Sequence, residues 1–143
     1  MNYELRESLG FIINSAGRAM SNRLAHNIKQ AGVDLTFEQW TVLNVLWERD
    51  GRPQTDLACM TDRDQPSTSR IVDNLIKRGL VCRKVDAKDR RVKLIYLTEE
   101  GKVLKNAAVA EAQRTIEEAS EGISPASVEL CKEVLRKIAA NLQ

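Results

Sequence analysis

Apolar side chains recur at steps of three and four over the first stretch of the chain, residues 3–31, which is the spacing of one face of an amphipathic helix. Gly32 then favours a helix end. At 1.5 Å per residue such a helix would be about 40 Å long, more than a small domain needs for its own core. We therefore expect its ends to pack on a partner subunit.

A second helix is predicted from Thr36, an N-cap residue with Gln39 at the capping-box position, to a stop at Asp50 and Gly51. Pro53 prevents its continuation. The side chains expected to be buried are Trp40, Leu43, Val45, Leu46 and Trp47.

Two further helices follow, and their order predicts a helix-turn-helix. A short helix over residues 55–61, with Leu57 and Ala58 inward, leads into a tight turn at Asp62 and Arg63. The next helix begins at the N-cap Asp64, carries Pro66 in its first turn and stops at Gly79. Its expected inward face consists of Thr68, Ile71, Val72 and Leu75. Its expected outer face, small and polar first and cationic beyond, consists of Ser67, Ser69, Arg70, Asn74 and Lys77.

Two segments of matching length, residues 80–85 and 92–97, are rich in β-branched and apolar side chains and bracket a polar loop, which predicts a two-stranded hairpin. Adjacent Leu94 and Ile95 interrupt the alternation of the second strand, so the pattern does not decide which face is inward.

The last part of the chain predicts two helices. Thr98 caps a helix that runs through an alanine-rich segment toward Gly122, and Ser124 with Pro125 opens the final helix. In that helix apolar positions repeat as in a narrow helix–helix seam, namely at Val128, Cys131, Leu135, Ile138 and Leu142. Together with the long first helix, this predicts a dimer interface built by both termini; packing of the two terminal helices only on one another is the alternative.

Composition is typical of one soluble globular domain, with 143 residues, 43% hydrophobic and 29% charged. An aromatic content of 4% and three prolines favour a mainly α fold with a minor β part. The start of the chain has no signal-peptide pattern, and no uncharged run approaches the roughly 18 residues of a membrane span, so a cytoplasmic protein without a membrane partner is expected. The three cysteines, Cys59, Cys82 and Cys131, have no disulfide or metal spacing and are expected to be buried, reduced thiols.

Positive charge is concentrated between residues 77 and 93, where eight basic residues stand against two acidic ones, although the whole chain carries only +2. Such a cluster is the footprint of a surface that replaces counterions along a phosphate backbone. The alternative is an ordinary solvated charge run.

Two motifs resemble the MarR family of bacterial transcription regulators. Residues 54–58, 67–75 and 78–81 are similar to the helix-turn-helix and the start of the wing in that family. The wing signature of the family, an Asp, an Arg two residues on, then Leu-Thr and a Gly, is matched by Asp89, Arg91, Leu97, Thr98 and Gly101. The chain departs from the family at Thr61 and Arg63, where aliphatic residues usually pack the turn, and Arg63 is a candidate phosphate contact instead.

The resemblance implies a winged helix-turn-helix with a two-stranded wing over residues 36–98, and dimerisation helices over residues 3–31 and 99–142 of a single domain. It assigns Arg91 to the DNA minor groove, held by Asp89 on the same side of an extended segment. Phosphate contacts would come from the remaining wing cations, Lys88, Arg90 and Lys93. Contacts to the major groove and nearby phosphates would come from the recognition helix, through Pro66, Ser67, Ser69, Arg70, Asn74 and Lys77.

The function predicted by these features is a homodimeric regulator of transcription that binds a pseudo-palindromic double-stranded DNA operator. By resemblance it is more often a repressor released by a small aromatic or anionic effector, whose pocket would involve Phe11, Trp40 and Trp47. An enzyme is not expected, because the chain has one histidine, His26, and no catalytic or phosphate-loop motif. No cofactor and no metal are expected. A winged-helix protein-interaction module and a thiol-based redox sensor remain as alternatives.

Overall fold

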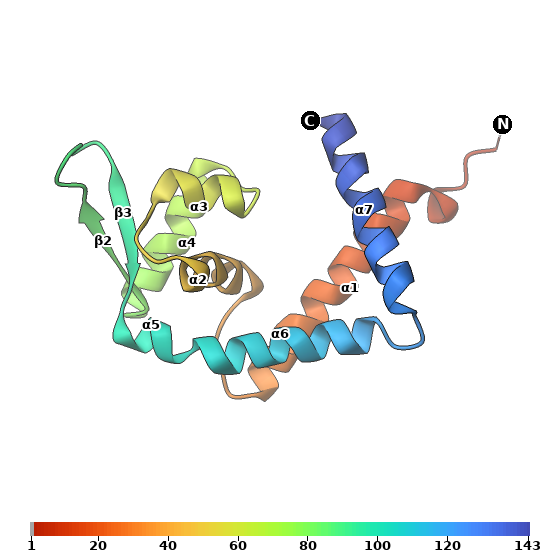
Figure 1. Cartoon of the computed structure of the whole chain (residues 1–143), viewed down its shortest axis with the longest axis horizontal. Coiled ribbons are helices and arrows are strands. Elements are labelled where there is room, and N and C mark those ends of the chain that lie inside the picture. The colour runs from red at the N-terminus through yellow and green to blue at the C-terminus, as the bar shows by residue number, and fades with distance from the viewer. Residues whose placement is uncertain (1) are drawn as a thin grey trace.

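The computed structural model describes residues 2–143, and Figure 1 shows how its elements are arranged. A winged part, with helices α2 to α4 and a small sheet, lies at one end, and the terminal helices α1 and α7 lie at the other. Helix α6 runs between these two ends. In chain order the elements are η1 (Leu5–Glu7), α1 (Leu9–Gln30), α2 (Phe37–Glu48), β1 (Arg52–Pro53), α3 (Gln54–Met60), α4 (Gln65–Lys77), β2 (Val81–Val85), β3 (Lys93–Leu97), α5 (Glu99–Val103), α6 (Lys105–Ala119) and α7 (Pro125–Leu142).

Helix α1 is shorter than predicted, because Ser8 interrupts the periodic segment that begins at Tyr3. Ser8 has an extended backbone, and its hydroxyl donates to the carbonyl oxygen of Leu5 at 2.6 Å. Serine side chains compete in this way with regular helix hydrogen bonding. The preceding residues form the separate 3-10 turn η1, so α1 is about 33 Å long rather than about 40 Å.

The predicted starts of α2 and α4 are confirmed by their capping geometry. Thr36 and Gln39 form the reciprocal capping box, with the Gln39 backbone N–H donating to Thr36 Oγ1 at 3.1 Å. The Ser67 N–H donates to Asp64 Oδ1 at 2.7 Å, and Asp62 takes a positive φ of 56° in the turn before it. Short polar side chains tolerate this left-handed conformation, so the turn that orients α4 is encoded locally.

The hydrophobic core lies in the winged part and extends to the C-terminal end of α1. Residues Val42, Leu43, Leu46, Leu57, Ile71, Val72, Leu75 and Ile95 are almost completely inaccessible to solvent. Trp40 and Val45, predicted to be buried, are only half-buried, because they lie toward the edge of this core. Within α1 only Leu24, Asn27 and Ile28 are buried, so the N-terminal half of that helix contributes little to the core of the chain.

The wing belongs to a three-stranded antiparallel sheet of order β1-β3-β2, so the prediction of two strands was incomplete. Strand β1 has two residues, and Pro53 had indicated only the end of a helix. Such a short strand has no periodicity that a sequence could reveal. It pairs with β3, where Ile95 is fully buried and Leu94 is half-buried, which resolves the orientation of that strand.

The helix predicted from Thr98 to Gly122 is divided at Leu104 into α5 and α6. Gly101 allows α5 to lie close against the winged part, because a Cβ at this position would lie 2.1 Å from the Leu80 carbonyl oxygen. The Gly101 carbonyl oxygen also accepts a hydrogen bond from the Trp47 indole N–H at 2.9 Å. Helix α6 instead packs along α1. The chain changes direction at Leu104, between α5, which packs against the winged part, and α6, which packs along α1.

Helix α7 has no buried residue and turns back from the end of α6 beside α1 (Figure 1). The two helices border an open apolar groove of about 600 Å³. The expectation of buried thiols was wrong, because Cys59 and Cys131 are exposed and Cys82 is half-buried. Within residues 2–143, no helix is long and apolar enough to cross a bilayer.

Candidate nucleic-acid interface

Helix α4 presents the predicted two faces. The inward residues Thr68, Ile71, Val72 and Leu75 are at most 2% exposed. On the other side Pro66, Arg70, Asn74 and Lys77 are exposed, whereas Ser67 and Ser69 are half-buried. The result is a helix whose first turn carries small side chains and whose later turns carry longer polar ones, which permits close approach of the N-terminal end to a surface.

Arg70 is held only loosely on this face. Its Nη2 lies 3.6 Å from Glu38 Oε2 on α2, and its side chain is 60% exposed. An ion pair in this position is worth little because solvent and salt screen it. The guanidinium can therefore exchange Glu38 for another anion at small cost.

The wing carries a closely bound pair, Asp89 and Arg91. Arg91 Nε donates to Asp89 Oδ1 at 3.1 Å and Nη2 donates to Oδ2 at 3.2 Å, while the Arg91 side chain stays 91% exposed. These bonds to Arg91 lower the pKa of the Asp89 carboxyl below its ordinary value. The prediction that the two residues share an extended segment was wrong: they lie in a turn closed by the Val92 N–H on the Asp89 carbonyl at 3.0 Å.

Besides Arg91, two more of the eight basic residues in the charged window are bound within the protein. Arg83 Nη2 donates to Gln54 Oε1 and to Asp73 Oδ1, both at 2.9 Å, and so ties β2 to α3 and α4. Arg78 Nη1 donates to Gln39 Oε1 at 2.9 Å. The exposed positive surface therefore consists mainly of the wing tip and the end of α4, with Lys77, Lys88, Arg90, Arg91 and Lys93. Lys84 is also exposed, and its Nζ lies 4.9 Å from the centroid of the Tyr96 ring.

Arg63 does not extend toward the outer face as a phosphate contact would. It is half-buried, and its Nη1 donates to Thr41 Oγ1 on α2 at 2.7 Å. Thr61, the other departure from the family pattern, donates to the Leu57 carbonyl at 2.6 Å. Polar contacts thus replace the aliphatic packing of this turn.

The three residues predicted to share an effector pocket are not brought together. Trp40 stacks on Phe37, with ring centroids 6.0 Å apart, and both line a cavity of about 260 Å³ between α1, α2 and α6. Trp47 is buried and borders a different cavity, and Phe11 lines neither. Sequence reasoning missed Phe37, although its position one turn before Trp40 on α2 was the available signal.

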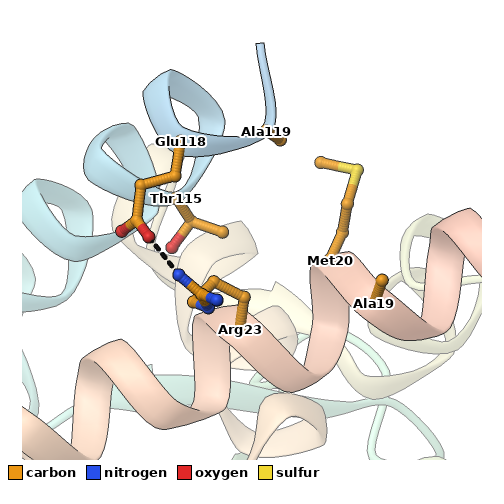
Figure 2. Close-up of a pocket in the computed structure, with 6 residues that line it drawn as sticks. All are labelled: Ala19, Met20, Arg23, Thr115, Glu118 and Ala119. Atoms are coloured by element: carbon orange, nitrogen blue, oxygen red, sulfur yellow. Dashed lines mark hydrogen bonds and ion pairs between the residues drawn. The ribbon is translucent and has the colours of Figure 1, made fainter. Parts of the chain in front are cut away.

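A second cavity, of about 210 Å³, adjoins the first between α1 and α6 (Figure 2). Arg23 reaches across it from α1 to form an ion pair with Glu118 on α6. Asn27, only 2% exposed, donates to Glu118 Oε1 at 2.9 Å, and this bond together with the Arg23 pair lowers the pKa of the Glu118 carboxyl. The polar side chains Arg23, Asn27 and Glu118, which lie between the two helices here, are therefore paired with one another.

Comparison with known proteins supports the interpretation of the winged part and of the whole chain. The MarR family sequence model matches residues 35–93. The transcriptional regulator MhqR of Bacillus subtilis is 26% identical over 133 residues, covering 93% of this chain and 90% of that protein.

Solved structures extend the match to the terminal helices. The Staphylococcus aureus MepR–DNA complex aligns with a TM-score of 0.85 at 27% identity, covering 94% of this chain and 98% of that one. CouR from Rhodococcus jostii RHA1, bound to p-coumaroyl-CoA, aligns with a TM-score of 0.82 at 28% identity, covering 96% of each chain. With the helix-turn-helix, the braced wing and the terminal helices all in place, residues 35–93 match the MarR family, and the whole chain is similar in sequence and fold to winged helix-turn-helix transcription regulators of that family.

Proposed function

We propose that this protein is a cytoplasmic, homodimeric transcription regulator that binds a pseudo-palindromic DNA operator and has no enzymatic activity. The observation that carries the proposal is the pairing of an exposed recognition helix with a wing whose Arg91 is pre-ordered by Asp89 at 3.1 Å. In this proposal residues 36–98 form the DNA-binding unit, and residues 3–31 and 99–142 form the dimerisation unit. The MepR–DNA complex supports DNA as the partner.

Within this interface the helix and the wing have different roles. The first turns of α4 enter the major groove with Pro66, Ser67, Ser69, Arg70 and Asn74, because their small or loosely held side chains allow close approach to base edges. The exposed cations Lys77, Lys88, Arg90 and Lys93 contact phosphates, which fixes position but carries no sequence information. Arg91 enters the minor groove, with Asp89 as its support.

Dimerisation follows from the apolar groove between α1 and α7. Large apolar side chains of this groove are exposed in the single chain, including Leu9, Ile12, Leu130, Val134 and Leu135. Contiguous exposed apolar surface of this kind marks an interaction site, and a second copy of the same helices would cover it. Two recognition helices held in this way would read half-sites about one helical turn apart.

The cavity lined by Phe37 and Trp40 is the proposed effector site. In this proposal the protein represses transcription while it is bound to DNA, and binding of the effector releases it. The first turns of α2 touch both this cavity and the arginines of the helix-turn-helix. Glu38 Oε2 lies 3.6 Å from Arg70 Nη2, Gln39 Oε1 accepts from Arg78 Nη1 at 2.9 Å, and Thr41 Oγ1 accepts from Arg63 Nη1 at 2.7 Å. A ligand that moves the start of α2 would therefore shift α4 through these three contacts.

Binding to DNA from the region upstream of its own gene, measured by fluorescence anisotropy over a series of salt concentrations, tests the proposal. Affinity should fall linearly with salt on logarithmic axes, with a slope that reflects several displaced counterions. A scrambled duplex of the same length serves as the control and should bind more weakly. Equal affinity for both duplexes, or no dependence on salt, would contradict sequence-specific DNA binding.

A further inference from the structure

Two helices, α1 and α6, join the winged part to the apolar groove, and they pack along one another (Figure 1). The C-terminal end of α1 lies in the core of the winged part, and α6 is attached to that part through α5. The groove is formed by the N-terminal half of α1 and by α7, which follows α6. The register of α6 on α1 therefore sets how the winged part is placed relative to the groove.

The shapes of the packed side chains do little to fix this register. The face of α6 toward α1 and the core carries small side chains, with Ala108 fully buried and Ala112 half-buried. Two cavities, of about 210 and 260 Å³, lie along the contact, and both are lined by Met20 and Thr115. Close interlocking of core side chains selects a single packing arrangement, and small side chains and cavities interlock poorly.

The buried amide of Asn27 makes directional contacts across this contact of α1 with α6. Its Nδ2 donates to Thr115 Oγ1 at 3.0 Å and to Glu118 Oε1 at 2.9 Å, so both amide hydrogens are used. Asn27 is 2% exposed, whereas the Arg23 side chain, which pairs with the same Glu118, is 56% exposed and screened by solvent. A slide of one helical residue, about 1.5 Å, would take the two Asn27 bonds out of hydrogen-bond range.

The shift that these bonds oppose is comparable to one step of DNA. A slide of about 1.5 Å in each of two protomers changes the separation of their recognition helices by up to about 3 Å. One base pair adds about 3.4 Å along the duplex. A single buried amide can fix the register of packed helices, and here the register corresponds to about one base pair of half-site spacing.

We propose that Asn27 is a positioning residue that fixes the register of α6 on α1 and so determines which half-site spacing the dimer accepts. The inference rests on the proposed function for its effect on DNA, but the register itself is measured without DNA. Failure of DNA binding and failure of the register role are therefore separate results.

Asn27→Leu removes both bonds and leaves the buried neighbours with partners, since Thr115 still donates to the Glu111 carbonyl and Glu118 still pairs with Arg23. The variant should stay folded, which thermal unfolding checks. The upstream duplex that the parent protein binds is compared with the same duplex after insertion or deletion of one base pair at its centre. The parent protein should lose about tenfold or more in affinity for the altered duplexes, and Asn27→Leu about threefold or less.

Two further variants control for stability. Asn22→Leu, at an exposed position of the same helix, should keep the spacing preference of the parent protein. Thr115→Val retains the shape of the side chain and removes one of the two bonds, so its preference should be intermediate, and it replaces Asn27→Leu in the test if that variant does not fold. A loss of stability alone would weaken binding to all three duplexes equally and would leave their ratio unchanged.

The distance between the two protomers measures the register directly. Cys59 is exposed on α3 of the winged part, so a spin label on it gives one distance per dimer once Cys82→Ala and Cys131→Ala have removed the other thiols. Asn27→Leu should shift or broaden this distance by about 3 Å, because α6 can then slide on α1. Asn22→Leu should leave it unchanged.

A folded Asn27→Leu protein that keeps either the spacing preference or the label distance of the parent protein would overturn the inference, and the same criterion applies to Thr115→Val. If the parent protein binds no duplex, the proposed function fails, and the label distances alone decide whether Asn27 fixes the register.

Discussion

The Asp89 carboxylate binds the Arg91 guanidinium and the Arg91 backbone N–H at the same time. The side-chain bonds are 3.1 and 3.2 Å long, and the backbone N–H donates to Oδ1 at 3.1 Å. An exposed arginine normally samples many rotamers, and holding it in one reduces the entropy that binding must remove. By holding Arg91 in one orientation before DNA binds, this turn of the wing lowers the entropy that is lost when the arginine enters a groove.

Substitutions of Arg91 and of Asp89 distinguish the effect of the Arg91 charge on DNA binding from the effect of its fixed orientation. Arg91→Ala should weaken DNA binding and reduce the logarithmic salt slope by about one unit, because one cation no longer displaces a counterion. Asp89→Asn retains that cation but loses the charged acceptor, so affinity should fall without a loss of slope. Fluorescence anisotropy over a salt series measures both. An unchanged slope for Arg91→Ala would mean that Arg91 does not approach the phosphates.

Much of the winged part was predictable because its signals are local. Thr36 with Gln39, and Asp64 with Pro66, define helix starts within four residues, and the inward face of α4 follows from a period of 3.6. The break at Ser8 was missed because periodicity continues through it, and β1 was missed because two residues carry no period.

The candidate site was only partly predictable, since side-chain pairing depends on distant residues. Arg83 and Arg78 counted as part of the basic surface, yet they bind Asp73 and Gln39, which are separated from them by 10 and 39 residues. Phe11 and Trp47 are aromatic like Trp40, but only the fold decides that Trp40 and Trp47 border different cavities and that Phe11 lines neither. Charge counts from sequence therefore overestimate how many cations can meet DNA.

Stability should depend on pH through Glu118. Its hydrogen bond from Asn27, followed by its pairing with Arg23, lowers the pKa of the folded carboxyl below the ordinary value of 4.5. Its stabilising contribution is therefore fully present above about pH 4.5 and is lost as the pH falls through the lowered folded pKa. Urea unfolding midpoints at a series of acidic pH values should show this loss.

Glu118→Gln should remove part of that dependence on pH, because the amide cannot titrate. The same substitution at the exposed Glu117 is the matched control and should leave it unchanged. Identical pH profiles for Glu118→Gln and the parent protein would mean that the contacts across α1 and α6 do not contribute.

The apolar groove between α1 and α7 should decide the oligomeric state. Val134→Glu puts a charge into the groove, where it would have to be buried in a dimer, so the protein should become monomeric at micromolar concentration. Val103→Glu, at a position 76% exposed on α5, is the control and should remain dimeric. Light scattering measures both masses. If the Val134→Glu protein becomes monomeric, its DNA affinity should also fall, because each monomer then binds one half-site alone. If it stays dimeric, the interface lies elsewhere.

Arg83 should affect DNA binding through position and not through charge. Its bonds to Gln54 and Asp73 fix the base of the wing against α3 and α4, and its side chain is only 26% exposed. Arg83→Gln should therefore loosen the wing and weaken DNA binding while leaving the logarithmic salt slope unchanged, since the guanidinium displaces no counterion. Asp73→Asn removes the charged partner from the other side and should reproduce the effect. Lys84→Gln, one residue along the same strand at an exposed position, is the matched control and should retain the wing orientation. A slope reduced by about one unit in Arg83→Gln would instead make Arg83 a phosphate contact.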